Sequence, residues 1–180
     1  MIPAITFDDI IRNIYNELSI QTGISKDMIK NVVGVRGTSL AKRLSSTEFG
    51  SINLNDKFII FELNEDEDTS NNVTINEYDD TVNSFMAYNF NIKVYGNHAH
   101  LVAQQILTRF KSHQVAYKLK EVGIWLTEIT FPTNVNEFIN NTMWPRCDLT
   151  LKLRVRHNIP LIEPEGTISE DNCEIIINEI

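Results

Sequence analysis

The stretch Phe85-Met-Ala-Tyr-Asn-Phe-Asn-Ile-Lys-Val-Tyr95 decides the fold of this chain. Its apolar side chains alternate with Asn89, Asn91 and Lys93, and this period of two predicts a long β-strand with one buried and one wet face. A turn follows, and Asn97 is suited to cap a helix. One face of that helix carries the apolar residues Ala99, Val102, Ala103, Ile106 and Phe110. We therefore expect the helix to pack on the buried face of the strand.

The clearest alternation in the chain runs from residue 146 to residue 156. A shift of one residue in the pairing of this strand would bury its charged set, so the register is strongly specified. Apolar stretches at 57–63 and 124–131 predict two further strands. The alternating strand has the apolar positions Cys147, Leu149, Leu151, Leu153 and Val155 and the polar positions Arg146, Asp148, Thr150, Lys152, Arg154 and Arg156.

The N-terminal part predicts a second main helix at residues 7–21, which Thr6 caps and Gly23 ends. A short helical stretch is expected at 26–33, and one or two further helical turns are expected at 112–122. Residues 133–145 are interpreted as a loop, because they lack a clear period.

These elements predict an α+β fold, with a mixed, mainly antiparallel sheet of about four or five strands and two main helices packed on one face. We expect one domain at 1–160, which contains an irregular segment at 35–56. It also contains an acidic segment at 62–80, which is either a mobile loop or the tip of a protruding hairpin. Residues 161–180 are interpreted as an acidic C-terminal extension.

The net charge of −8 is unevenly distributed. Residues 62–80 carry eight acidic side chains and no basic one, and residues 163–180 carry six acidic side chains and no basic one. Residues 81–162, in contrast, carry nine basic and four acidic side chains. Acidic blocks are commonly solvated loops. Alternatively, the acids of one copy meet the basic strand of the next copy, which would direct self-association.

The pattern of polar residues favours no catalytic, cofactor or metal site. Cys147 and Cys173 have no neighbouring ligands at zinc spacing, so both are interpreted as small apolar residues. His98 and His100 are two positions apart, and a helix would point them to different sides. Residues 34–39 lack the spacing of a phosphate-binding loop, and residues 64–68 lack the glycine and distal glutamate of a calcium loop. We expect no enzyme and no cofactor.

Membrane insertion and secretion are not expected either. No apolar run approaches the roughly 20 residues that cross a bilayer, and residues 1–9 do not have the pattern of a signal peptide. The basic positions of the strand at 146–156 could contact nucleic-acid phosphates. The acidic chain and the lack of exposed aromatic residues between those positions favour a solvated or inter-subunit face instead.

The order of these elements and three short motifs resembles the tail terminator and neck proteins of long-tailed bacteriophages. The motifs are Val94-Tyr-Gly-Asn-His-Ala99 between a strand and a helix, Gly123-Ile124 at the start of a strand, and Trp144-Pro-Arg146 before the last long strand. The resemblance extends over residues 5–159.

The resemblance implies a virion structural protein, not an enzyme, that is assembled in the host cytoplasm. It implies a homo-hexameric ring that caps the tail tube and joins the tail to the head connector. The ring's partners would be the tail tube protein and a connector or adaptor protein, and DNA would pass through its channel without sequence-specific binding.

For such a ring, complementary charge identifies candidate interface residues. We predict that basic side chains of one copy lie opposite acidic side chains of its neighbour or of the tube. Two alternatives stay open. One is another phage structural subunit, of the tail tube or of head completion, and the other is a cellular α+β binding module or an enzyme with an unrecognised site. The candidate basic residues are Arg146, Lys152, Arg154 and Arg156, and the candidate acidic residues are Glu65, Asp66, Glu67 and Asp68.

Overall fold

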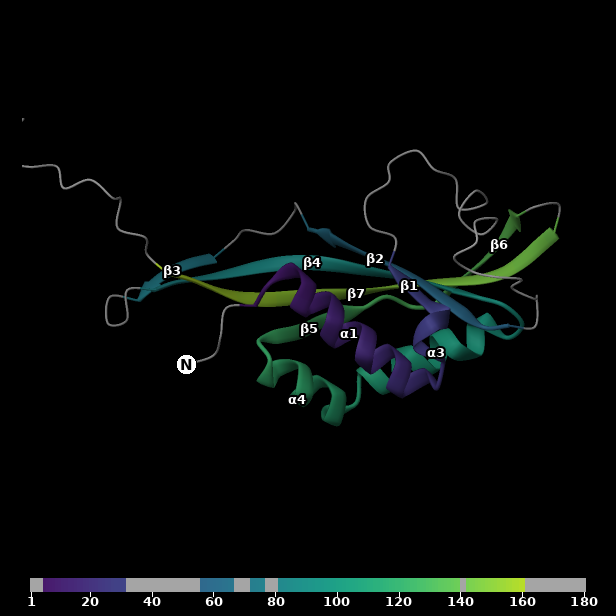
Figure 1. Cartoon of the computed structure of the whole chain (residues 1–180), viewed down its shortest axis with the longest axis horizontal. Coiled ribbons are helices and arrows are strands. Elements are labelled where there is room, and N and C mark those ends of the chain that lie inside the picture. The colour runs from purple at the N-terminus through teal and green to yellow at the C-terminus, as the bar shows by residue number, and fades with distance from the viewer. Residues whose placement is uncertain (1–4, 32–55, 67–71, 77–80, 140–141, 161–180) are drawn as a thin grey trace, which may run out of the picture.

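A computed structural model describes residues 5–31, 56–66, 72–76, 81–139 and 142–160 of the protein. Within these residues, seven strands form one mixed sheet, and three α-helices lie against one of its faces (Figure 1). The predicted α+β class is confirmed. Residues 35–55 of the predicted irregular segment at 35–56 and the predicted extension at 161–180 lie outside the described residues.

The order of the longest hydrogen-bonded path through the sheet is β1-β2-β4-β7-β5. In addition, β3 pairs with β4 and β6 pairs with β7. The pairing of β1 with β2 is parallel, and the other pairings are antiparallel. The strands are β1 (Ile29–Asn31), β2 (Phe58–Glu65), β3 (Asn72–Asn76), β4 (Thr81–Tyr95), β5 (Ile124–Ile129), β6 (Thr133–Ile139) and β7 (Thr142–Pro160).

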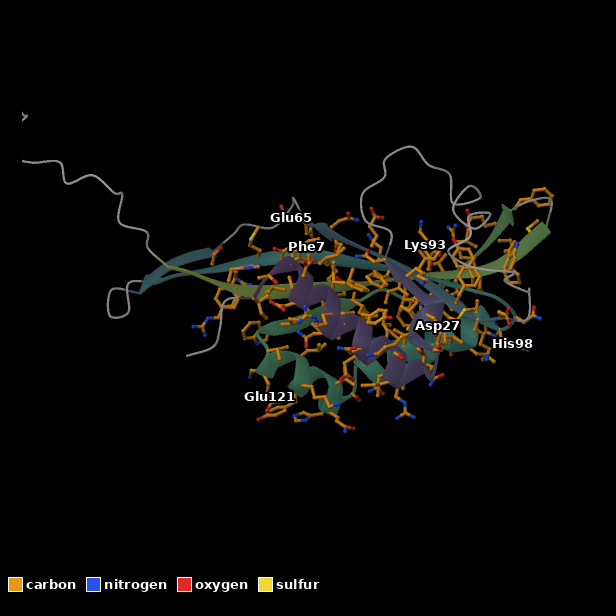
Figure 2. The ribbon with its side chains drawn as sticks, viewed as in Figure 1. Phe7, Asp27, Glu65, Lys93, His98 and Glu121 are labelled. Carbon is orange, nitrogen blue, oxygen red and sulfur yellow. The ribbon has the colours of Figure 1, made fainter. Side chains whose placement is uncertain are left out.

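The two longest strands form the centre of the sheet, and their register matches the predicted alternation. Thr81 of β4 lies opposite Pro160 of β7, and Tyr95 lies opposite Arg146. Apolar partners therefore meet on one face, and polar residues such as Lys93 occupy the other face (Figure 2). The buried partners from these strands are Tyr88, Phe90, Ile92, Val94, Cys147, Leu149, Leu151, Leu153 and Val155.

The helices α1 (Phe7–Thr22), α3 (Ala99–Phe110) and α4 (His113–Glu121) cover the apolar face. The predicted cap of α1 is confirmed, because Thr6 and Asp9 bond to each other's backbone N–H groups in a capping box. Gly23 ends α1 in the left-handed conformation. All five apolar positions predicted for α3 are buried, so the helix packs as expected.

One charged residue of α1, Glu17, is buried. Glu17 accepts a hydrogen bond from Gln21 and lies 3.2 Å from the Nζ atom of Lys118 in α4. A buried carboxylate needs such partners, because burial removes its water. This ion pair therefore ties α1 to α4 across the helix layer.

The structure corrects two local predictions and agrees with one of the two alternatives for a third segment. Residues 26–33 contain a short 3-10 helix, η1 (Lys26–Met28), followed by β1 instead of a continuous helix. The interpretation of 133–145 as a loop is wrong, because β6 and the start of β7 pair there. The acidic segment 62–80 contains the end of β2 and all of β3, which agrees with the hairpin alternative. Tertiary pairing outweighs weak strand propensity at these sites.

The sheet extends beyond the helices at both ends (Figure 1). At one end β3 pairs with the first part of β4, and at the other end β6 pairs with the first part of β7. The 19 residues of β7 span about 65 Å at roughly 3.4 Å per residue. The β6–β7 hairpin is therefore an arm that projects from the two-layer body.

Candidate functional site

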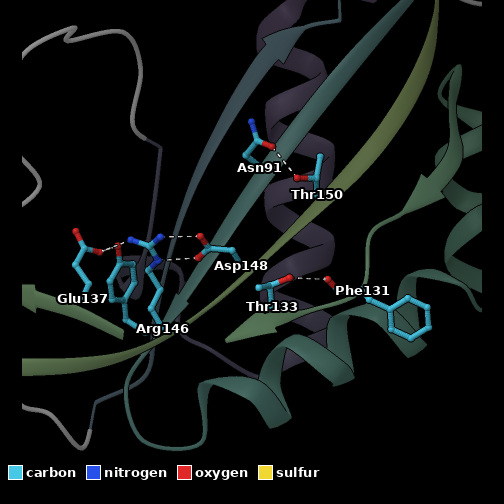
Figure 3. Close-up of polar contacts among 8 residues, drawn as sticks. Asn91, Phe131, Thr133, Glu137, Arg146, Asp148 and Thr150 are labelled. Carbon is cyan, nitrogen blue, oxygen red and sulfur yellow. Dashed lines mark hydrogen bonds and ion pairs between the residues drawn. The ribbon is translucent and has the colours of Figure 1, made fainter. Parts of the chain in front are cut away.

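A network of polar side chains lies where the β6–β7 hairpin leaves the body (Figure 3). The Nε and Nη2 atoms of Arg146 donate to the two carboxylate oxygens of Asp148, each at 2.8 Å. The Nη1 atom of Arg146 donates to Oε2 of Glu137 at 2.5 Å, and the hydroxyl of Tyr95 donates to the same oxygen at 2.8 Å. The guanidinium thus holds β6, β7 and, through Glu137, the end of β4 together.

The pKa shifts in this network keep the Arg146 guanidinium charged and the Tyr95 hydroxyl protonated. Burial by itself would lower the pKa of Arg146, but hydrogen bonds to Asp148 and Glu137 outweigh burial and raise it. Burial and the hydrogen bond to Glu137 both raise the pKa of the Tyr95 hydroxyl. Tyr95 therefore stays protonated and donates its hydrogen bond throughout the physiological pH range.

Aromatic rings and a close backbone approach complete this region. The Phe58 ring stacks on Tyr95 at 4.7 Å between centroids and meets Trp144 edge-on at 5.7 Å. Gly96 has φ +105° and donates its N–H to the carbonyl of Pro145 at 3.1 Å. The structure thus brings together two motifs that lie about 50 residues apart in the sequence. We call Tyr95, Gly96, Glu137, Arg146 and Asp148 the hairpin joint.

The four predicted basic interface residues lie on the sheet face away from the helices, but their surroundings differ. Only 16% of the Arg146 side chain is exposed, and its guanidinium bonds within the chain. Lys152 pairs with Glu128 at 2.9 Å, while Arg154 is exposed and lies over the Phe85 ring at 5.0 Å. Arg156 is half-buried opposite Phe85. Arg154 is therefore the most accessible cation of the set.

The structure describes two of the four predicted acidic interface residues. Glu65 is exposed at the end of β2, and Asp66 follows it and donates its backbone N–H to the carbonyl of Ala87. The hydrogen bond to Glu128 raises the pKa of Lys152, and the charge of Asp66 contributes to this shift. Part of the predicted complementarity thus operates within one chain. Glu67 and Asp68 lie outside the described residues.

The histidines predicted at the start of α3 are both exposed. His98 occupies the N-cap position in the left-handed conformation, where Asn97 was predicted, and its side chain makes no capping hydrogen bond. Among the described residues, no group of three or more His, Cys, Asp or Glu side chains could hold a metal ion. None of the described helices is long and apolar enough to span a membrane.

Several residues that matter for this region were not predicted. Glu137 lies in the segment that the sequence predicts as a loop, and for Tyr95 the sequence predicts only the end of a strand. Phe138 and Met143 are large, exposed apolar side chains opposite each other on the β6–β7 hairpin. The sequence does contain one signal that could have identified Glu137, because it is the single charged residue between 129 and 145.

Comparison with known proteins places the chain in a family. A family model described as phage neck terminator protein matches residues 24–178. The match begins after α1 and includes most of the segment that we predicted as a C-terminal extension. The comparison with curated proteins finds no match. Because the family model covers most of the chain, this protein belongs to the phage neck terminator family and is a structural protein of the phage neck.

Proposed function

We propose that the protein forms a hexameric ring that caps the tail tube and joins the tail to the head connector, leaving a channel for DNA. Membership in the neck terminator family supports a role at this junction. Assembly in the host cytoplasm and a final location in the virion neck belong to the same proposal. Capping the tail tube and joining the tail to the head connector are binding functions of a closed assembly, so the ring needs no catalytic residue.

The shape of the sheet is the observation that carries this proposal. Both ends of the β4–β7 ribbon run past the helix layer, and each end carries an additional paired strand (Figure 1). A monomeric domain gains little from paired strands outside its core, since they bury little apolar surface. Two different projecting ends suit a head-to-tail contact, and such a contact closes into a ring when its rotation closes.

Charge contributes a second, salt-sensitive part of the proposed contact. We propose that Arg154 and its neighbour Arg156 meet acidic residues of the next subunit or of the tube, with Glu65 and Asp66 as described candidates. We propose that Arg146, whose guanidinium bonds within the hairpin joint, positions this face and that Arg154 and Arg156 reach the partner. The subunit is acidic overall, and a channel without net basic charge would not retain DNA phosphates.

The first experiment is a measurement of absolute mass by light scattering after size exclusion, over a concentration series and with isolated tail tubes. Six subunits of 20.7 kDa correspond to about 124 kDa. A discrete species of that mass, free or on tube ends, supports the ring. A protein that stays monomeric at every concentration and does not bind tube ends contradicts it.

Charge reversal tests the electrostatic part. In the double variant Arg154→Glu and Arg156→Glu, we expect weaker assembly because like charges then face each other. The control variant Arg109→Glu and Lys120→Glu makes the same change in net charge on exposed positions of α3 and α4. If both variants assemble like the wild type at low and high salt, these arginines do not lie in the contact.

A further inference from the structure

The segment that forms β6 and its flanks is almost free of charge. Between residues 129 and 145 the sequence contains one charged side chain, Glu137, in a protein in which 22% of residues are charged. Glu137 bonds to Tyr95 and Arg146 within the chain. The centres of protein interfaces are depleted in charged residues and enriched in aromatic residues and methionine. This segment has that composition.

Two apolar side chains of the segment are exposed side by side on the projecting hairpin. Phe138 lies opposite Met143 in the register of β6 and β7, and the two side chains are 64% and 54% exposed. An antiparallel pair of this kind brings its Cβ atoms within about 5.5 Å of each other. The hairpin thus presents one compact apolar knob, formed by Phe138 and Met143.

A hollow of about 220 Å³ lies elsewhere on the same chain, between the helix layer and β5. Its lining combines the apolar residues Phe110, Ala116, Leu126 and Ile129 with the polar residues Lys111, Thr127 and Glu128. An apolar protein cavity of about 150 Å³ holds benzene, so this hollow has room for one phenyl ring. Nearby Phe131 is 79% exposed and would extend the apolar surface.

The knob cannot reach the hollow of its own chain. Ile129, which lines the hollow, pairs with Leu151 of β7. The knob includes Met143, which lies eight positions before Leu151 on the same strand. That separation corresponds to about 27 Å along a straight strand. The knob and the hollow are therefore two different surfaces that a second copy could join.

We propose that the knob of one subunit inserts into the hollow of the next subunit, with Phe138 as the central anchor. This inference rests on the proposed ring and assigns its subunit contact. The contact is head-to-tail, because the knob and the hollow are different patches. The hairpin joint sets the direction of the knob, since Arg146 and Glu137 connect β6 to the body.

A pair of matched surface variants tests the proposal by light-scattering mass and by sedimentation. The test variant carries Phe138→Ser and Met143→Ser. The control carries Ile20→Ser and Leu101→Ser, whose wild-type side chains are 64% and 55% exposed on α1 and α3. Loss of two anchor side chains should weaken association by more than about tenfold, and the control should assemble like the wild type. Equal assembly of the test variant and the control would overturn the proposal.

Cysteine cross-linking tests the direction of the contact in full-length protein with Cys173→Ser. Asn136→Cys, at an exposed position on the same face of β6 as Phe138, is combined with Thr127→Cys, because Thr127 lines the hollow and Phe138 and Met143 then stay in place. Under mild oxidation, a ladder of covalent oligomers beyond the dimer supports the head-to-tail contact. Each single cysteine variant should stay uncross-linked. Dimers from Asn136→Cys alone would show that two knobs meet each other, and this outcome would overturn the proposal.

The same experiments separate this inference from the proposed function. If the wild type forms no ring, free or on tubes, the proposed function fails and the subunit contact fails with it. If the wild type forms rings and the Phe138→Ser and Met143→Ser variant forms them equally well, only the inference fails. A variant that forms normal rings but does not bind tubes would assign the hairpin to the tube contact and overturn the inference.

Discussion

Gly96 connects the end of β4 to the turn before α3, and its replacement by alanine should be strongly destabilising. Its φ of +105° is strained for any residue with a Cβ atom, at a cost of about 1–3 kcal/mol. An added Cβ would also lie 2.2 Å from the carbonyl oxygen of Asp56, where ordinary contact begins at 3.4 Å. The backbone would have to move by about 1.2 Å, the difference between these distances.

That movement should disturb the hydrogen bond from the Gly96 N–H to the Pro145 carbonyl, which contributes about 1 kcal/mol. The sum of these two terms predicts a loss of about 2–4 kcal/mol in the free energy of unfolding for Gly96→Ala. The measurement is urea unfolding followed by far-UV circular dichroism and by fluorescence. A loss of this size is a large part of the total stability of a typical domain.

Gly23 provides a matched control. It has φ +69° at the end of α1, and an added Cβ would meet no atom within 4 Å. Gly23→Ala therefore carries the conformational cost alone, about 1–2 kcal/mol. If the two variants lose the same free energy of unfolding, the contact between the added Cβ and the Asp56 carbonyl oxygen adds no cost, and the reasoning is refuted.

Three further predictions concern Arg146, Cys147 and Asp9. Arg146→Leu leaves two partly buried carboxylates without their cation, and urea unfolding should show a loss of about 2–3 kcal/mol; an unchanged midpoint would contradict the role of the network. Burial raises the pKa of the Cys147 thiol, so in a Cys173→Ser background alkylation should require unfolding; rapid labelling of native protein would contradict this. The hydrogen bonds from Thr6 lower the pKa of Asp9 below its ordinary value, so the cap stabilises the fold above that value and is lost as the pH falls through the lowered pKa. Thermal unfolding of Asp9→Asn should accordingly lose less stability on acidification than the wild type, and equal losses would rule the cap out as the cause.

The elements with strong periodicity could be predicted from the sequence. In β4 and β7 the alternation shows directly which side chains face the helices, because neighbouring residues of a strand point to opposite faces. The stripe of α3 was equally clear, and all its members are buried. β6 could not be predicted in this way, because Asn134 and Asn136 interrupt it and asparagine disfavours strands. It pairs because β7 offers a free edge beside it.

The hairpin joint was only partly predictable, for a different reason. Arg146 was a candidate because of its charge, but periodicity reports which face a side chain occupies and not which partner it meets. Its partner Glu137 is nine positions away across a hairpin, and Tyr95 reaches Glu137 over 42 positions. Contacts of this kind depend on the register of three strands, which a single sequence pattern does not contain.

On the β6–β7 hairpin, charged side chains fix the position of the arm, whereas apolar side chains are exposed for contact. The charges of Arg146, Glu137 and Asp148 are satisfied within the chain, so their desolvation is compensated before any partner binds. An interface that relied on this guanidinium would first have to break three hydrogen bonds. The arm is therefore held by polar bonds at its base, while Phe138 and Met143 further along it are exposed and apolar. That division suits a subunit contact whose direction is set in the monomer, because little conformational entropy remains to be lost on assembly.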